Sequence, residues 1–200
     1  MRRTGRILIG VLLLGALAGA PILAPRADAE STPAAEAPSE AAGRIGFVGH
    51  NIFGAAHGVF HVWRVVEHQV DLADPTASHA VVEVTLASVD TKTKGRDDHL
   101  RTPDFFDVEK YPVATVRGHS PRPLPPGPDG RARYAVKFDV DLHGVKKTLD
   151  GEVEIAQTSP VVVEGGFTLL RSDFGVGEAP SRWNPMSIDD EVPVRFRVRF

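Results

Sequence analysis

Five ionisable side chains, Arg96, Asp97, Asp98, His99 and Arg101, lie within six consecutive residues. Carboxylates beside a histidine could act as an acid and base pair. However, adjacent residues of an extended chain point apart, and the two arginines keep the carboxylates ionised. Two acids among three basic groups can instead hold a connection in a fixed shape through charge-assisted hydrogen bonds. The cluster therefore predicts a firmly anchored loop, with direct contact to a ligand as the alternative.

The rest of the chain offers no nucleophile with a partner base, since it contains no G-x-S-x-G, H-E-x-x-H or P-loop motif. His57 and His61 are spaced to share one face of a strand or helix, and His50 precedes them. No acidic residue between His50 and Val66 completes a familiar set of metal ligands. We therefore predict a protein that is not an enzyme and that uses no metal and no cofactor.

Composition and charge exclude further classes of function. The chain has no cysteine, which rules out disulfides, thiolate metal sites and an acylated lipoprotein cysteine. Residues 1–29 hold four of the 23 basic and one of the 26 acidic residues, so their removal leaves 19 against 25, a formal net charge of −6. An acidic domain has no electrostatic reason to bind nucleic acid or an anionic membrane surface, and we expect neither partner.

The first 29 residues have the pattern of an export signal. Arginines near the start precede an apolar run over residues 7–20, and Ala-Asp-Ala at 27–29 offers a small-x-small cleavage site. The apolar run is shorter than the about 20 residues that a membrane span needs. We therefore predict signal-peptide cleavage, no stable membrane insertion, and a periplasmic or secreted protein, with retention of the segment as an uncleaved anchor as the alternative.

Residues 30–43 are rich in Ala, Pro, Glu and Ser without a large apolar side chain, so we predict a disordered linker there. The remaining residues 44–200 are enough for one domain with a substantial core. Strand patterns dominate this domain, and no segment longer than two turns carries a helical period. We expect strands at residues 45–53, 58–72, 80–89, 111–116, 133–143, 145–156, 161–174 and 191–200.

Two connections between these strands carry their own signals. Thr102, Pro103 and Asp104 indicate a helix start, because threonine caps free amides, proline suits the first helical position and aspartate favours the positive end of the helix dipole. We expect a short helical segment near residues 95–110. Residues 119–130 predict a mobile, proline-rich loop. Seven or eight strands with short turns indicate an antiparallel barrel or sandwich, and the pattern alone does not choose between them.

Three blocks of sequence resemble the signature of one family. They read SVDT, RDDHLR and DFFDVEKYP over residues 88–112, LHGVKK at 142–147 and RSDFG at 171–175. This order resembles the YceI family of secreted lipid-binding or polyisoprenoid-binding proteins. The resemblance implies a lipocalin-like antiparallel β-barrel of about eight strands. Its apolar interior would hold an isoprenoid lipid, such as a polyprenyl chain or a quinone.

Because of this resemblance, the apolar side chains on the strand faces are candidate ligand-binding residues. We expect these side chains to line the interior: Phe105, Phe106, Tyr134, Val136, Phe138, Val140, Phe167, Leu169, Val194, Phe196 and Val198. Arg96, His99 and Arg101 are the candidates for contact with a polar head group at the mouth of the barrel.

A filled core is the alternative to a hollow one, because the same apolar faces would line either. The protein would then be a periplasmic stress-related or interaction barrel without a lipid, using surfaces at Trp63 and Trp183. The alternating last strand, which ends at Phe200, also leaves an outer-membrane barrel open, although 7% aromatic residues is low for two interfacial girdles. A homodimer is open as well.

Overall fold

The computed structural model of the chain describes residues 43–179, 181 and 187–200. The predicted signal peptide, residues 1–29, lies outside the described residues, as does the predicted linker, residues 30–43, apart from its last residue. Trp183 lies outside them as well. The predictions made for these segments therefore stay predictions.

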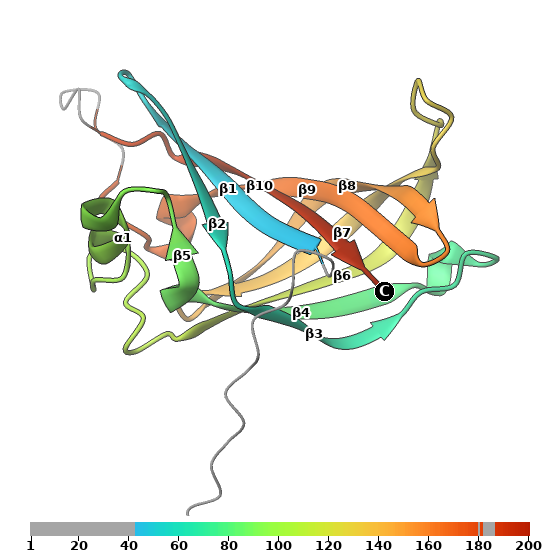
Figure 1. The fold of residues 1–200 in the computed structure, drawn as a ribbon, viewed down its shortest axis with the longest axis horizontal. Helices are drawn as coiled ribbons and strands as arrows, with labels where there is room; N and C mark the ends of the chain where they lie inside the picture. The colour runs from blue at the N-terminus through green and yellow to red at the C-terminus, as the bar shows by residue number, and fades with distance from the viewer. Residues whose placement is uncertain (1–42, 180, 182–186) are drawn as a thin grey trace, which may run out of the picture. The chain divides into compact units, whose positions relative to one another are not determined.

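The ten strands that the described residues form belong to one antiparallel sheet, which curls around an apolar interior (Figure 1). Their spatial order is β3-β4-β6-β7-β8-β9-β10-β1-β2-β5. The all-β, antiparallel, barrel-like architecture predicted from the sequence is confirmed. The strands are β1 (Gly43–Asn51), β2 (Gly54–Phe60), β3 (Trp63–Gln69), β4 (His79–Thr85), β5 (Val89–Asp90), β6 (Val113–Leu124), β7 (Arg133–Leu142), β8 (Val145–Thr158), β9 (Val161–Leu170) and β10 (Glu191–Arg199).

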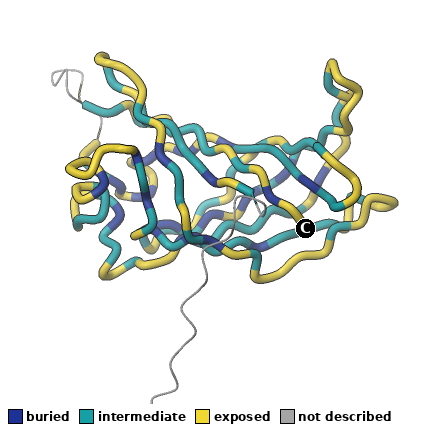
Figure 2. The backbone as a smooth tube through the Cα atoms, in the orientation of Figure 1, coloured by how far each residue is buried: buried dark blue, intermediate teal, exposed yellow. Residues whose placement is uncertain are grey.

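The interior follows from the two-residue period of the strands. In β7 the inward-facing Val136, Phe138 and Val140 are all buried, whereas Lys137 and Asp139 between them form ion pairs on the outer surface. Figure 2 shows buried stretches alternating with partly exposed ones along the strands. Apolar side chains of successive strands therefore meet on the concave face of the sheet.

The strand predicted at residues 58–72 is two strands, β2 and β3, which stand near opposite ends of the sheet order. The chain changes partner at His61 and Val62. Their amides donate to Ser88, at 3.3 Å to its backbone oxygen and at 3.0 Å to its Oγ. Together with the two-residue strand β5, this division gives ten strands in the described domain rather than about eight.

The short helix α1 spans Lys94–Leu100, upstream of the start predicted at Thr102. The hydroxyl of Thr102 donates back to the backbone oxygen of His99 at 2.7 Å, so it closes the helix instead of opening one. The predicted helical segment near residues 95–110 is confirmed, but it begins earlier than the capping pattern indicates. No helix in the described part of the chain is long and apolar enough to cross a membrane.

The first half of the proline-rich segment predicted as a loop at residues 119–130 lies within β6, which ends at Leu124, and the second half forms the connection to β7. A β-bulge in this strand absorbs a register shift, and Ser120 there has a φ of 53°. A bulge leaves a residue unpaired, so Pro121 costs the sheet no ladder hydrogen bond. Three short 3-10 helices complete the described connections: η1 (Pro75–Ala77), η2 (Leu86–Ser88) and η3 (Arg171–Phe174). The strand predicted to run to residue 174 thus ends before η3.

The charged cluster fastens α1 to the chain that precedes it. Arg101 donates from Nε to the backbone oxygen of Ala87 and from Nη2 to that of Val89, both at 2.8 Å. The buried Asp97 carboxylate accepts the amide of Thr91 at 2.8 Å. These hydrogen bonds form the anchored loop that the cluster predicts.

Replacing Arg101 with Ala is expected to lower the free energy of unfolding by about 1–3 kcal/mol, because two backbone carbonyls lose a charged donor. Chemical denaturation followed by circular dichroism measures the change. Lys94→Ala is the matched control, since Lys94 pairs with Asp98 at the surface and such pairs contribute about 1 kcal/mol or less. Equal losses in the two variants would show that Arg101 does not anchor the loop.

A second prediction concerns pH. The hydrogen bond from His61 and then those from Lys92 hold the pKa of Asp90 in β5 well below its ordinary value. An ionised carboxylate with a lowered pKa stabilises the fold above the pKa of the unfolded chain, about 3.9, and this contribution is lost as the pH falls through the folded value. Asp90→Asn should therefore lower the urea midpoint most near about pH 7, and the difference from the parent should shrink below about pH 4. A difference in urea midpoint that stays constant down to about pH 2.5 would contradict this linkage.

Candidate functional site

The inside of the sheet contains an apolar cavity of about 440 Å³ at the end of the domain where α1 lies. Strands β1, β2, β4, β6, β7, β9 and β10 contribute to its wall, together with α1 and the turn that follows it. Its polar lining side chains are His50, Asn51, Thr91, Arg96 and Arg171, and the other lining residues are apolar or glycine. A concave apolar space of this size with a few polar groups is typical of a site for a small ligand.

A smaller cavity of about 160 Å³ continues the interior toward the other end of the strands. Along β7, Val140 and Leu142 line the larger cavity, whereas Tyr134, Val136 and Phe138 line the smaller one. The apolar surface is continuous between them, because both cavities share the following wall residues: Ile45, Val84, Val116, Phe167 and Val194.

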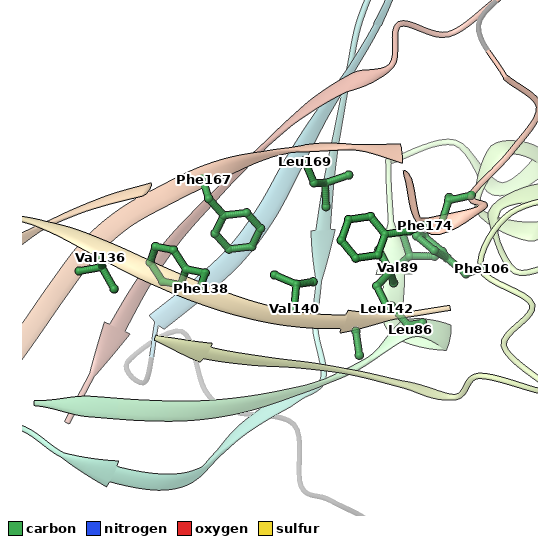
Figure 3. Packing of buried hydrophobic residues seen from close by; sticks show 12 residues of the cluster. Leu86, Val89, Phe106, Val136, Phe138, Val140, Leu142, Phe167, Leu169 and Phe174 are labelled. Carbon is green, nitrogen blue, oxygen red and sulfur yellow. The ribbon is translucent and has the colours of Figure 1, made fainter. Parts of the chain in front are cut away.

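Three aromatic rings stand where the two cavities approach each other. The ring centroid of Phe138 lies 5.0 Å from that of Phe167 and 5.8 Å from that of Phe196. Figure 3 shows Phe138 of β7 and Phe167 of β9 pointing toward one another. Phe167 lines both cavities, whereas Phe138 and Phe196 line the smaller one.

Each predicted interior side chain lines one or both cavities. The larger one takes Phe105, Phe106, Val140, Phe167, Leu169 and Val194. The smaller one takes Tyr134, Val136, Phe138, Phe167, Val194, Phe196 and Val198. The structure thus brings these residues together around one interior, and their contact with a ligand stays a prediction.

Two aromatic side chains of the wall, Phe47 and Phe60, were not predicted from the sequence. Their ring centroids lie 5.6 Å apart, and both rings contact Phe106. The signal that could have found them is Gly58, which pairs with Phe47 across β1 and β2. A Cβ atom at Gly58 would come within 2.3 Å of the Phe47 ring, so the glycine makes room for that ring.

Among the predicted head-group residues, Arg96 is the one that lines the larger cavity. Its Nε donates to Oγ1 of Thr91 and its Nη2 to the backbone oxygen of the same residue, both at 2.8 Å. Nη2 also donates to Oγ1 of Thr93 at 3.2 Å. Within the described residues, Nη1 of Arg96 has no hydrogen-bond partner. The guanidinium is therefore held in place with one nitrogen unused.

The structure places His99 and Arg101 outside the linings of both cavities. Arg101 is engaged with backbone oxygens and with Asp98. The His99 side chain is 59% exposed, and its ring lies edge-on to Phe105 with centroids 4.8 Å apart. Asp98 stays ionised, because the hydrogen bond from Lys94 lowers its pKa. The geometry thus supports Arg96, and neither of the other two, as a contact for a head group.

Arg171 in η3 also lines the larger cavity and was not among the predicted site residues. Its buried guanidinium donates to the backbone oxygens of Val176, Ile188 and Asp189 at 3.1, 2.7 and 3.1 Å. It belongs to the block RSDFG, but a sequence motif does not show that the partners are backbone carbonyls. These hydrogen bonds hold the segment that leads into β10 in place.

No group of three or more His, Asp or Glu side chains in residues 43–179, 181 and 187–200 is arranged to hold a metal ion. His61 is instead bonded to the Asp90 carboxylate at 3.0 Å. Trp63, the residue proposed for an interaction surface, is only 5% exposed and packs with Ile45 and Val84. It therefore provides no surface for a partner.

Comparisons with known proteins agree with this architecture. The family model of the YceI-like domain matches residues 38–200. A UPF0312 protein of Pseudomonas savastanoi pv. phaseolicola is 32% identical over 142 residues, which cover 67% of this chain and 71% of the relative. A UPF0312 protein of Vibrio cholerae is 32% identical over 114 residues, 57% of this chain. That match spans about half of the relative's length, 48%.

Two solved structures share the fold. BcnA of Burkholderia cenocepacia is 23% identical with a TM-score of 0.68, over 79% of this chain and 96% of that one. A polyisoprenoid binding domain from Saccharophagus degradans, implicated in plant cell wall breakdown, is 20% identical with a TM-score of 0.59, over 78% of this chain and 92% of that one. With the family model matching most of its length, the chain belongs to the YceI-like family.

Proposed function

We propose that the protein is a non-catalytic carrier that binds an isoprenoid lipid, or a similar amphiphile, inside the curled sheet. The observation that carries this proposal is the continuous apolar interior of about 440 and 160 Å³. Burial of apolar surface is favourable by about 25 cal/mol per Å², so a long hydrocarbon tail would bind there without polar contacts. A polyprenyl chain or the tail of a quinone has this chemistry.

Two further observations support this class of ligand. The Saccharophagus degradans neighbour is described as polyisoprenoid-binding, and its fold is shared by this chain. The polar lining side chains of the larger cavity are few, and the Thr91 hydroxyl among them is already engaged, since it donates to the Asp97 carboxylate and accepts from Nε of Arg96. Binding, rather than catalysis, is the function that such a lining serves.

Arg96 is the residue proposed to meet the head group. Its Nε and Nη2 are held by Thr91, and Nη1 has no partner among the described residues. A guanidinium nitrogen forms short, strong hydrogen bonds with the oxygens of a phosphate and also donates to a quinone carbonyl. The tail would then extend past Phe105 and Phe106 toward the aromatic rings at the centre.

The carrier is proposed to work outside the cytoplasm, in the periplasm or after secretion. The support for this location is the basic start, apolar run and cleavage pattern of residues 1–29. A lipid of very low solubility cannot cross the water between or beyond membranes at a useful rate without a carrier protein. The proposed binding would provide that carrier.

Native mass spectrometry of the protein purified from its own cells, followed by solvent extraction, tests the proposal. We expect one prenyl lipid per chain, which is two lipids per molecule if the spectrum shows a homodimer. The mass of the chain itself would reveal whether residues 1–29 were removed. A protein that carries no lipid and takes up no offered quinone or polyprenol would favour the alternative of a periplasmic barrel without a lipid ligand.

Ala114→Phe is expected to reduce the lipid-bound fraction from near-stoichiometric to minor, because Ala114 is buried on the cavity wall and the added ring would occupy ligand space. Val113→Phe is the matched control, since Val113 is the preceding residue of β6 and is 42% exposed. Mass spectra of the two variants give the comparison. Equal lipid loading in Ala114→Phe and Val113→Phe would show that the ligand does not bind in the larger cavity.

Arg96→Gln is expected to weaken binding of farnesyl phosphate by about tenfold or more, because a hydrogen bond to a charged group contributes about 1.5–3 kcal/mol. Binding of farnesol, which lacks the phosphate, should change little. Lys94→Gln serves as the control on the exposed side of α1. Titration calorimetry of both ligands measures the difference, and an equal loss for farnesol and farnesyl phosphate would contradict a head-group role.

A further inference from the structure

The hairpin of β1 and β2 has an exposed apolar tip. Ile52 and Phe53 are 72% and 70% exposed, more than any other large hydrophobic side chain in the described residues. No Lys, Arg, Asp or Glu occurs between Arg44 and Arg64, so apart from Arg44 near the start of β1 the hairpin is free of carboxylates and of permanently charged cations. Figure 2 shows this tip as an exposed projection. Large apolar side chains exposed together on an uncharged surface indicate a contact site.

The tip lies at the mouth of the larger cavity. Phe53, Asn51 and Gly54 belong to the cavity lining, so the apolar surface of the interior continues outward onto the tip. Beyond Phe47, the last residue of β1 that pairs with β10, the hairpin projects past the end of the sheet, on the same side as α1 (Figure 1). It is held close behind the tip, where the amide of Asp189 donates to the backbone oxygen of His50 at 2.8 Å.

We propose that this tip inserts into the interfacial region of a lipid bilayer and opens the larger cavity toward the acyl chains. The inference rests on the proposed carrier function, since a lipid cargo must leave or enter a membrane. Ile52 and Phe53 would lie among the lipids while the rest of the domain stays in water. The contact is peripheral and reversible, because only a hairpin tip is buried.

Charge selects a neutral bilayer as the partner. The hydrocarbon region excludes ionised side chains, and the hairpin has no Lys, Arg, Asp or Glu from Ile45 to Phe60. Near the mouth, Lys92 pairs with Asp90 and Lys94 with Asp98, which leaves Arg96 as a cation without a carboxylate partner among the described residues. One such cation is no basic patch for anionic lipid or for an acidic protein. Attachment would therefore depend on apolar burial, and salt would change it little.

Phe53→Trp provides a local reporter of insertion. The emission of the new tryptophan is obtained by subtracting the spectrum of the parent protein from that of the variant. When phosphatidylcholine vesicles are added, this emission should shift to shorter wavelength. Vesicles with brominated acyl chains should quench it. Anionic lipid should not be required. If the tryptophan emission of Phe53→Trp remains typical of a water-exposed indole with every vesicle tested, the inference is overturned.

Ile52→Asp tests the same tip without altering a lining residue. We expect its vesicle partition coefficient to fall by about tenfold or more, since burial of one large aliphatic side chain is lost and a charge is added. Val66→Asp is the matched control, because Val66 is also exposed, at 43%, but lies in β3 outside both cavity linings. Equal partitioning of the two variants would contradict membrane contact by the tip.

Two measurements separate this inference from the carrier proposal. Uptake of farnesol in vesicle-free solution should be unchanged in Ile52→Asp, whereas its transfer from vesicles should slow. Normal farnesol uptake without vesicle contact by the parent would overturn the docking inference alone, whereas docking without farnesol uptake would overturn the carrier alone. A blue shift that appears without vesicles, rises with protein concentration and accompanies dimers in sedimentation would assign the tip to a second copy of the chain.

Discussion

The alternation of apolar and polar side chains on a curled antiparallel sheet is the constraint on which the rest of the structure depends. It gives one concave apolar face, which the packed rings of Phe138, Phe167 and Phe196 bridge at its centre. Three rings hold β7, β9 and β10 together, but they do not fill the length of the strands. The unfilled space at either side of them is the pair of cavities, so the core and the candidate site are parts of the same surface.

The end of the domain that contains the larger cavity is held by arginines bound to backbone carbonyls. Loops at the end of a barrel leave carbonyl groups without strand partners, and such groups are costly to bury unsatisfied. Arg101 satisfies two of them beside β5, and Arg171 satisfies several in the connection before β10. All three guanidinium nitrogens of each are used as donors, which explains why neither is free to meet a ligand in the way that Arg96, with its unused Nη1, is.

The sequence predicted the inward faces of β7 and β10 because their apolar and polar residues alternate without a break. It failed where tertiary contacts decide the structure. His61 and Val62 are not turn formers, and their backbone hydrogen bonds to Ser88 and Thr85 mark the point where β2 gives way to β3. The prolines of residues 119–130 resemble a loop, but β6 takes in Pro121, at a bulge, and Pro123. Mixed polarity in the first two strands also hid the aromatic residues of β1 and β2 from the predicted lining.

A carrier must meet two demands that oppose each other. Its interior has to keep water away from an apolar cargo, which the curled sheet and its aromatic centre do, yet the cargo has to pass between that interior and a membrane. A cavity ringed by charges at its mouth would oppose the passage, because each apolar segment of the cargo would cross a polar boundary. Here the lining reaches the surface through Phe53, at the tip of a hairpin that has no carboxylate and no permanent cation from Ile45 to Phe60. Storage and exchange are then properties of one continuous apolar surface, part of which is enclosed and part of which is exposed.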